Sequence, residues 1–270
     1  MSAHLQRPLS IRDVQAYKER GERFAMLTAY DHPTAEILDE AGVPILLVGD
    51  SVGDNVLGYD STVPVTMADM LHHTRAVRRG ARRAVVVADL PFMSYQVSVE
   101  DGVRNAGRLV KEGGATAVKL EGAARVVDLV ARLVAIGIPV MGHLGLTPQS
   151  VLQMGHRVQG RDEAGAEAIV AAAAALAAAG AFAIVLEAVP ADLARRVTQA
   201  VPIPTIGIGA GPGTDAQVMV IHDLLGVSSG RLPRFVKAYA DLRSTITDAV
   251  KAYQAEVASG DYPAAEHTYT

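Results

Sequence analysis

The sequence predicts an α/β fold, and within that class a (β/α)8 barrel with one extra helix at its N-terminus. Apolar runs that suit strands buried on both faces alternate with helical segments, in units of roughly thirty residues, as is typical of a parallel sheet. Eight such strands can be placed along the chain. The length of 270 residues also suits one barrel. Since no break in composition divides the chain, a single catalytic domain over residues 1–270 is predicted.

The first predicted strand covers residues 24–29. The second, Ile45–Val48, is followed by Gly49, Asp50 and Ser51. Glycine on either side of Asp50 and Ser51 lets the backbone turn tightly and leaves room for a ligand. The other strands are predicted at residues 85–89, 117–121, 139–143, 184–187, 204–211 and around 224–227.

The predicted helices are placed by capping residues and by glycines that follow them. Ser10 begins a short helix to about residue 20, Gly42 ends a second over residues 33–41, and Thr66 caps a third through residue 79. Alanine is the best helix former, so the alanine-rich residues 164–179 before Gly180 are predicted to be a packed helix and not a linker. The remaining helices are expected at residues 99–112, 124–135, 191–200 and 235–258.

Composition excludes several classes of function. The net charge is −4 without a block of lysine and arginine, so neither nucleic acid nor an anionic membrane is an expected partner. The chain has no cysteine, which rules out disulfides and thiol chemistry. Residues 1–8 lack the apolar core of a signal peptide, and no apolar stretch is long enough to span a bilayer. A soluble, cytoplasmic protein is therefore expected.

Three acids stand at the ends of consecutive predicted strands, namely Asp50, Asp89 and Glu121. In a barrel of this kind the carboxyl ends of the strands carry the chemistry, and consecutive strands are neighbours. Three carboxylates on one arc repel each other unless a cation lies among them, and ligation by oxygen alone favours Mg²⁺ over zinc. A single acid at such a position is as well explained by a helix cap or an arginine partner. Three at corresponding positions favour a metal site.

Two further polar residues lie on the strands beside this arc. Lys119 precedes Glu121 by two residues, so both side chains lie on one face of the strand. It could bind the carboxylate of an acid substrate, or form a structural ion pair inside the barrel. His143 could donate a hydrogen bond to a substrate, or be a packed, satisfied side chain.

Glu187 ends the sixth predicted strand, across from the metal arc and among the apolar residues Leu186, Ala188 and Val189. That setting is expected to raise its pKa toward the range of a general base. The alternative is another helix cap or ion-pair acid. Because Glu187 stands apart from the proposed metal, the base is favoured.

Two loops remain open to interpretation. Residues 145–161 form the longest irregular stretch, which is functional or disordered, and its position above the site favours a lid or wall of the pocket. Residues 207–211 are rich in glycine and could hold a phosphate, but they lack the dinucleotide spacing, and a tight, close-packed turn explains them equally well.

Motifs along nearly the whole chain resemble those of the ketopantoate hydroxymethyltransferase family. They are Thr28-Ala29-Tyr30-Asp31, Val48-Gly49-Asp50-Ser51-Val52-Gly53, Asp60-Ser61-Thr62-Val63-Pro64-Val65-Thr66, Ala88-Asp89-Leu90-Pro91-Phe92-Met93, Val118-Lys119-Leu120-Glu121-Gly122, Gly142-His143-Leu144-Gly145-Leu146-Thr147-Pro148-Gln149, Leu186-Glu187 and Ile206-Gly207-Ile208-Gly209-Ala210-Gly211. The chain departs from the family's commonest form at Ala188, where cysteine is frequent; no consequence is expected, since this residue should point away from the barrel interior.

The resemblance implies a barrel of the phosphoenolpyruvate/pyruvate type that uses one Mg²⁺ per subunit. By likeness, Asp50 and Asp89 are metal ligands that also meet the substrate, with Glu121 as third ligand, directly or through water. Ser51 and Lys119 match the contacts to the keto acid, and Glu187 matches the proton acceptor. The family is usually a homodecamer of two pentameric rings, which no feature of this sequence shows independently.

The reaction implied is the transfer of a hydroxymethyl group from 5,10-methylenetetrahydrofolate to 3-methyl-2-oxobutanoate, giving 2-dehydropantoate for pantothenate and coenzyme A synthesis. The metal would acidify C3 of the keto acid and stabilise the enolate formed when Glu187 removes its proton. A metal-dependent aldolase or lyase would use the same carboxylates without folate. A barrel that only binds a keto acid and assembles into rings is the alternative outside enzymes.

Overall fold

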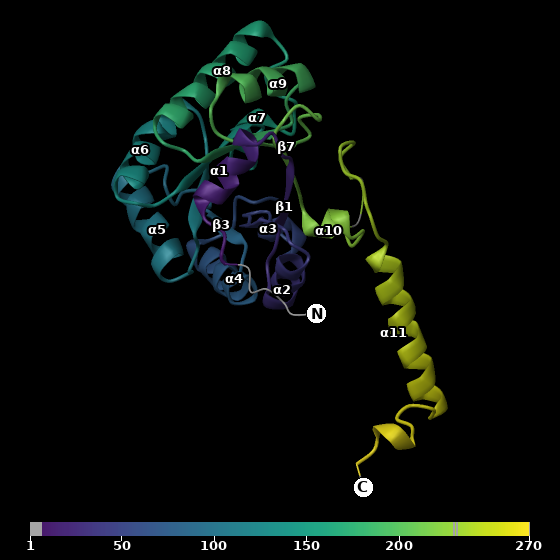
Figure 1. Cartoon of the computed structure of the whole chain (residues 1–270). Helices are drawn as coiled ribbons and strands as arrows, with labels where there is room; N and C mark the ends of the chain where they lie inside the picture. Colours follow the sequence, from purple (N-terminus) through teal and green to yellow (C-terminus); the bar gives the residue numbers. More distant parts are fainter. Residues whose placement is uncertain (1–6, 229, 231, 270) are drawn as a thin grey trace. The chain divides into compact units, whose positions relative to one another are not determined.

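The computed structural model describes residues 7–228, 230 and 232–269, so most of the N-terminal segment considered above lies outside it. The chain divides into two compact units, Met1–Val220 and Ile221–Thr270, which are described separately. The first is a closed barrel of eight parallel strands in the order β1 to β8, with helices around it (Figure 1). Because all eight strands lie in the first unit, that unit contains the whole barrel. The single domain over residues 1–270 stays a prediction.

Each strand pairs in parallel with the next one along the chain, and β8 pairs with β1 to close the sheet. The strands are β1 (Phe24–Thr28), β2 (Ile45–Val48), β3 (Val85–Asp89), β4 (Ala117–Glu121), β5 (Val140–Gly145), β6 (Ala183–Glu187), β7 (Thr205–Ile208) and β8 (Ala216–Met219). The first seven strands are confirmed within a few residues.

The predicted position of the eighth strand is wrong. Residues 224–227 follow or end the short helix α10 (Ile221–Leu224) of the second unit, whereas β8 lies eight residues earlier. Only Ala216 and Val218 of β8 are buried, and Gln217 between them is exposed. Two buried apolar residues are too weak a local pattern to mark a strand. Its pairing with β1 and β7 identifies it.

The helices of the first unit are α1 (Ile11–Glu19), α2 (His32–Glu40), α3 (Val52–Asn55), α4 (Met67–Gly80), α5 (Val99–Lys111), α6 (Val127–Ala135), α7 (Val151–Met154), α8 (Glu163–Ala178) and α9 (Ala191–Ala200), with short 3₁₀ turns η1 (Ala124–Val126) and η2 (Pro148–Ser150). Ser10 and Thr66 cap α1 and α4 as predicted, each in a capping box with the aspartate three residues on. The alanine-rich segment is the helix α8, capped by Asp162.

The second unit contains α10, the long helix α11 (Leu242–Ser259) and the turn η3 (Ala265–His267). The predicted start at residue 235 is wrong, since α11 begins after Asp241. The Asp241 side chain accepts a hydrogen bond from the Ser244 backbone N–H at 3.1 Å and so caps the helix there. Just before it, the Tyr239 N–H donates to the Leu224 carbonyl. Among the described residues, no helix is long and apolar enough to cross a membrane.

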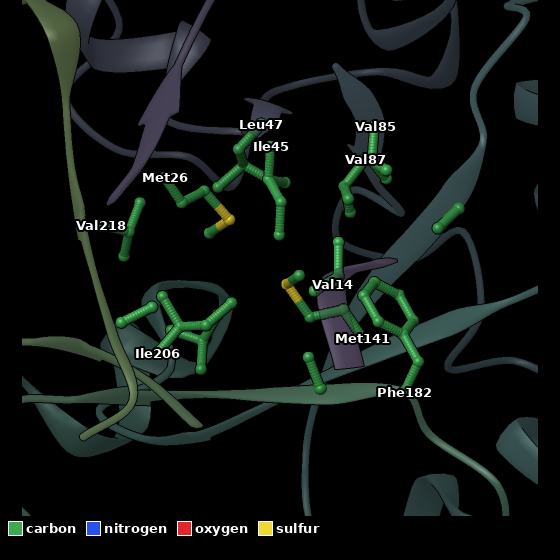
Figure 2. Packing of buried hydrophobic residues seen from close by; sticks show 14 of the residues in the cluster. Val14, Met26, Ile45, Leu47, Val85, Val87, Met141, Phe182, Ile206 and Val218 are labelled. Atoms are coloured by element: carbon green, nitrogen blue, oxygen red, sulfur yellow. The ribbon is translucent and has the colours of Figure 1, made fainter. Parts of the chain in front are cut away.

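The barrel interior is filled by apolar side chains from all eight strands. Figure 2 shows Met26, Ile45, Val85 and Met141 from four strands pointing toward one another, together with further residues of the same cluster. Val14 of α1 is fully buried in that cluster, so the extra N-terminal helix contributes to the core. The apolar filling leaves the other end of the barrel for polar groups.

The site residues at the ends of the strands lie on the same face of each strand as the apolar side chains of the barrel interior. Every second side chain of a strand lies on the same face. On β3, Asp89 therefore lies on the same face as the buried Val85 and Val87. On β4, Lys119 and Glu121 lie on the same face as Ala117. On β5, His143 shares the face of Met141, and on β6, Glu187 shares the face of Ala183 and Val185.

Candidate active site

Asp89 and Lys119 form the centre of the polar group. They lie opposite each other in the register of β3 and β4, and Lys119 Nζ is 3.0 Å from Asp89 Oδ1. Both side chains are buried. Burial opposes the charged ammonium, yet the carboxylates of Asp89, Glu121 and Asp50 outweigh it and raise the pKa of Lys119. Lys119 is therefore a cation held by acids, ready to attract an anionic substrate.

Asp50 joins this pair from the turn after β2. Its backbone N–H donates to Asp89 Oδ2 at 3.0 Å, which ties the end of β2 to the end of β3. Burial, followed by repulsion from Asp89 and Glu121, raises the pKa of the Asp50 carboxyl. Burial also raises the pKa of Asp89, against the opposing effect of Lys119. As predicted, the three acids share one arc of the barrel mouth.

His143 bridges two acids. Its Nδ1 lies 3.4 Å from Glu121 Oε1, and its Nε2 lies 3.3 Å from Glu187 Oε2. Burial and the nearby Lys119 favour the neutral ring, but the two carboxylates prevail and raise the pKa of His143 to about 9. The same imidazole, against the opposing effect of burial, lowers the pKa of Glu121. The two carboxylates thus favour the protonated ring, while the Lys119 ammonium, whose Nζ lies 3.3 Å from His143 Nδ1, opposes it.

Glu187 has a cationic neighbour that its apolar sequence context did not indicate. The His143 ring lies between Glu187 and Glu121 and links Glu187 to the arc, and the separation of Glu187 from the proposed metal stays a prediction. The Glu187 side chain is 18% exposed, whereas that of Glu121 is 3% exposed. Glu187 is therefore the acid of this pair that a substrate can reach.

The backbone at Glu187 is held by the end of β5. The Leu146 N–H donates to the Glu187 carbonyl at 2.8 Å. Gly145 has a φ of +93°, and a Cβ there would lie 2.2 Å from the Glu187 carbonyl oxygen. Only glycine permits both this φ and this approach. The position of the Glu187 backbone thus depends on Gly145.

Ser51 lies beside the arc and contacts a different partner. Its Oγ is 2.8 Å from the Tyr30 hydroxyl. Burial raises the pKa of Tyr30, so the phenol is neutral and can donate or accept this hydrogen bond. A Cβ at Gly49 would lie 2.8 Å from Ser51 Oγ, which explains the glycine before the acid.

Sequence reasoning missed two residues of the site, Gln149 and Tyr95. The Gln149 side-chain amide donates to Asp50 Oδ2 at 2.7 Å, and its backbone N–H donates to Glu121 Oε2 at 3.0 Å. The Tyr95 hydroxyl lies 2.7 Å from Gln149 Oε1. Both residues lie in polar loops, where no local pattern marks a buried side chain. For Gln149 the available signals were its place in the 145–161 segment predicted to line the pocket and in a family motif; for Tyr95 the signal was its place in the loop after a strand that ends in an acid.

A cavity of about 610 Å³ opens beside Glu121. Its walls come from the loops after β3, β4 and β5 and from α8, and include Tyr95, Gln96, Glu121, Gln149, Gln153 and Ile169. Residues 145–160 supply much of this wall, in agreement with their predicted place at a pocket. The segment is less irregular than predicted, since it contains η2 and α7.

The glycine-rich exit of β7 is a close-packed turn. A Cβ at Gly211, whose φ is +71°, would lie 2.5 Å from the Ala191 Cβ. A Cβ at Gly207 would lie 2.7 Å from Thr214 Oγ1. These contacts account for the glycines without a phosphate.

Comparison with known proteins decides the family. A model of the ketopantoate hydroxymethyltransferase family matches residues 8–265. The chain belongs to this family. A 3-methyl-2-oxobutanoate hydroxymethyltransferase of Moorella thermoacetica is 60% identical over 262 residues, which are 97% of this chain and 97% of the relative. That of Streptomyces coelicolor is 55% identical over 264 residues, 98% and 91% of the two chains.

Solved structures share the fold of this ketopantoate hydroxymethyltransferase family member. A phosphonopyruvate hydrolase in complex with oxalate and Mg++ matches with a TM-score of 0.61 at 13% identity, over 96% of this chain and 93% of that one. A 2,3-dimethylmalate lyase, described as a PEP mutase/isocitrate lyase superfamily member, matches with a TM-score of 0.59 at 17% identity, over 96% and 91%. The predicted (β/α)8 barrel is confirmed by these matches and by the closed sheet of eight parallel strands.

The acids of this family member fit a divalent cation. In the described part of the chain no three acidic or histidine side chains are already arranged as a metal cluster, since Lys119 and Gln149 contact the carboxylates instead. Glu121 Oε1 is buried, and its one close cationic neighbour among the described residues, His143 Nδ1 at 3.4 Å, makes no hydrogen bond to it. Burial and mutual repulsion raise the pKa of Asp50, as expected where a cation would relieve the crowding. A hard cation with oxygen ligands matches this donor set.

Proposed function

We propose that the chain transfers a hydroxymethyl group from 5,10-methylenetetrahydrofolate to 3-methyl-2-oxobutanoate, giving 2-dehydropantoate in pantothenate biosynthesis. The observation that carries this is the buried group in which Asp50, Asp89 and Glu121 surround Lys119, with Glu187 beside it on β6. In this group the Lys119 ammonium can attract the carboxylate of a keto acid, the three acids offer oxygen ligands to a metal, and Glu187 is a carboxylate that a substrate can reach. Membership of the family names the substrate for such a site.

One Mg²⁺ per subunit would be held by Asp50 and Asp89, with Glu121 as third ligand, directly or through water. When bound, it would polarise the keto group and acidify C3. Lys119, Ser51 and His143 would bind and orient the keto acid. The Lys119 ammonium favours its carboxylate, and the Ser51 hydroxyl, supported by Tyr30, can donate a hydrogen bond.

Glu187 would act as the general base. Its Oε2, 3.3 Å from His143 Nε2, would take the proton from C3. Water would add to the methylene group of the folate, both of its C–N bonds would break, and tetrahydrofolate and formaldehyde would result. The carbanion would attack the formaldehyde carbon to form the new C–C bond, and the formaldehyde oxygen would become an alkoxide. That alkoxide would take the proton from Glu187 and give the hydroxyl group of 2-dehydropantoate. His143 holds the Glu187 carboxylate in place and limits the negative charge near it.

The experiment that tests this function is an assay of 2-dehydropantoate formation with and without methylenetetrahydrofolate, and with and without EDTA. Product that requires both the folate and a divalent cation supports the proposal. Cleavage of a 2-oxo or 2-hydroxy acid without folate would identify a lyase of similar fold. Binding of the keto acid without turnover would identify a barrel that only binds it.

We propose further that the protein is cytoplasmic and assembles into a decamer of two pentameric rings, as the family resemblance implies. The experiment is a mass measurement of the purified full chain in solution. A monomer or dimer at micromolar concentration would contradict the decamer.

A further inference from the structure

Gln149 lies where the loop after β5 meets the acidic arc. It belongs to the turn η2, yet it is only 5% exposed. Although it follows β5, Gln149 makes hydrogen bonds at the ends of three other strands. Asp50 follows β2, Leu90 follows β3 and Glu121 ends β4. A loop residue with this reach is unusual, because loop side chains mostly face solvent.

The Gln149 amide uses its full hydrogen-bonding capacity. Its Nε2 donates to Asp50 Oδ2 at 2.7 Å and to the Leu90 carbonyl at 2.9 Å. Its Oε1 accepts from the Tyr95 hydroxyl at 2.7 Å and from Gln96 Nε2 at 3.1 Å. The orientation is fixed, because a flipped amide would place Oε1 against the Leu90 carbonyl oxygen. A buried and fully satisfied amide of this kind is rigid.

Gln149 holds two of the three proposed metal ligands by one oxygen each, one through its side-chain amide and one through its backbone N–H. Gln149 Nε2 contacts Asp50 Oδ2, and the backbone N–H contacts Glu121 Oε2. The other oxygen of Glu121, Oε1, is buried and faces His143 Nδ1 at 3.4 Å, a contact too long and poorly aligned for a hydrogen bond. Hydrogen bonds of this type orient ligating carboxylates, and their loss typically weakens metal binding.

The same residue faces the cavity of about 610 Å³ beside Glu121. Gln149 and its partners Tyr95 and Gln96 all line that cavity. A ligand that binds in this cavity and orders its wall therefore also changes the mobility of Gln149, the residue that contacts Asp50 and Glu121. By thermodynamic linkage, a cation bound to the acids must affect the wall in return.

We propose that Gln149 is a positioning residue that fixes Asp50 and Glu121 for cation binding and couples the wall formed by residues 145–161 to the metal. The inference rests on the metal site of the proposed function. Removing the side-chain amide frees the Asp50 carboxylate to rotate and removes the side-chain link between the wall and the cation, whereas the backbone N–H still holds Glu121. Loss of the Tyr95 hydroxyl loosens the amide without removing it.

The test is Mn²⁺ binding to the purified full chain, measured by electron paramagnetic resonance of the free ion, with Mg²⁺ as competitor. Gln149→Ala should weaken Mn²⁺ binding by about 10–100-fold. Tyr95→Phe should weaken it in the same direction by less. Gln153→Ala is the matched control, since Gln153 lines the same cavity on the same segment. It should bind Mn²⁺ like the wild-type protein.

Hydrogen exchange supplies a second readout that does not depend on activity. Saturating Mn²⁺ should increase the protection of residues 147–154 in the wild-type protein and in Gln153→Ala, but not in Gln149→Ala. Should Gln149→Ala fail to fold by circular dichroism, Gln149→Met decides the outcome, since it keeps the volume of the side chain but cannot donate to Asp50, whereas Tyr95→Phe also removes hydrogen bonds to the Glu121 backbone.

The outcomes separate the two proposals. A wild-type protein that binds no Mn²⁺ overturns the metal site and this inference with it. A wild-type protein that binds Mn²⁺, while Gln149→Ala and Tyr95→Phe bind it within twofold of wild type, overturns the inference alone. If Gln153→Ala weakened Mn²⁺ binding as much as Gln149→Ala, the inference would also be overturned. The loss would then come from any change in the cavity wall and not from the Gln149 amide.

Discussion

At the scale of single residues, the site is a balance of buried charges. Asp50, Asp89 and Glu121 bring negative charge to the barrel mouth, and Lys119 and His143 compensate part of it. A buried charge that loses its partner is costly, so each of these residues depends on the others. Glu187 differs, because it keeps some exposure while contacting His143. It is the residue best placed to exchange a proton with a bound substrate.

Replacing Glu187 by glutamine should remove the base and keep the shape of the site. A general base contributes about 10²–10⁴-fold, so loss of rate on that scale is expected. Affinity for the keto acid should change far less, because Lys119 and the metal would still hold it. Exchange of the C3 hydrogen with deuterated water, without folate, isolates this step. Exchange in the variant at the wild-type rate would place the base elsewhere.

Replacing Asp89 by asparagine should greatly weaken Mg²⁺ binding and activity. The barrel should remain folded, since asparagine keeps the shape of the aspartate side chain and Asp50 and Glu121 still face Lys119. Circular dichroism checks the fold, and calorimetric titration checks Mg²⁺ affinity. Full activity of this variant, or of the wild-type protein in metal-free buffer, would remove the metal from the mechanism.

At the scale of elements, the approach of β5 to β6 determines where the base lies. The chain leaves β5 through Gly145, and the following Leu146 N–H donates to the Glu187 carbonyl. The same chain then turns into the segment that lines the cavity. The exit of one strand thus positions Glu187, the proposed base, and begins the wall of the pocket.

Gly145→Ala should destabilise the protein and lower activity together. A left-handed alanine costs about 1–2 kcal/mol, and the added close contact costs about 1–3 kcal/mol more. Gly137→Ala is a matched control, because Gly137 has a similar φ of +89° and a Cβ added there would have nothing within 4 Å. Urea unfolding and turnover of both variants are the measurements. Equal effects in the two would show that the contact with Glu187 is unimportant.

The wall formed by residues 145–161 should gain order when substrates bind. It combines short helical turns with residues that face the cavity, so a ligand there would add contacts to it. Hydrogen exchange with and without keto acid and folate measures this. Identical protection in both states would make it an ordinary surface segment.

At the scale of the whole molecule, the barrel separates stability from chemistry. The apolar cluster fills one end of the interior, while the polar group occupies the carboxyl ends of the strands. A cation bound there contacts residues that follow or end β2, β3 and β4, so its binding should stabilise the folded barrel as a unit.

Mg²⁺ at about 100 times its dissociation constant should stabilise the folded state by about 2.7 kcal/mol. For a chain of this size class that corresponds to a rise in Tm of roughly 5–10 °C. Calorimetric scans with Mg²⁺ and with EDTA make the measurement. Asp89→Asn is the control and should show little rise. The same rise in both proteins would mean that the ion acts at another place.

The sequence by itself determined the class of fold and the acids of the site. Apolar runs, caps and strand-end acids are local patterns, and a parallel barrel brings all its strand ends to one mouth. Asp50, Asp89, Lys119 and Glu121 could therefore be predicted as neighbours from the order of the strands alone, and they are found together.

Only the tertiary structure decided the contacts that depend on distant segments. Gln149 and Asp50 are 99 positions apart, and Lys119 and His143 are 24 apart, so no local pattern pairs them. The closure of the barrel by β8 is likewise visible only in the pairing of β8 with β1. The four residues of β8 are too short and too little buried a pattern to predict a strand from the sequence. Hydrogen bonds and ion pairs between loops and strands form once the backbone has placed them, and their partners are set by packing and not by periodicity.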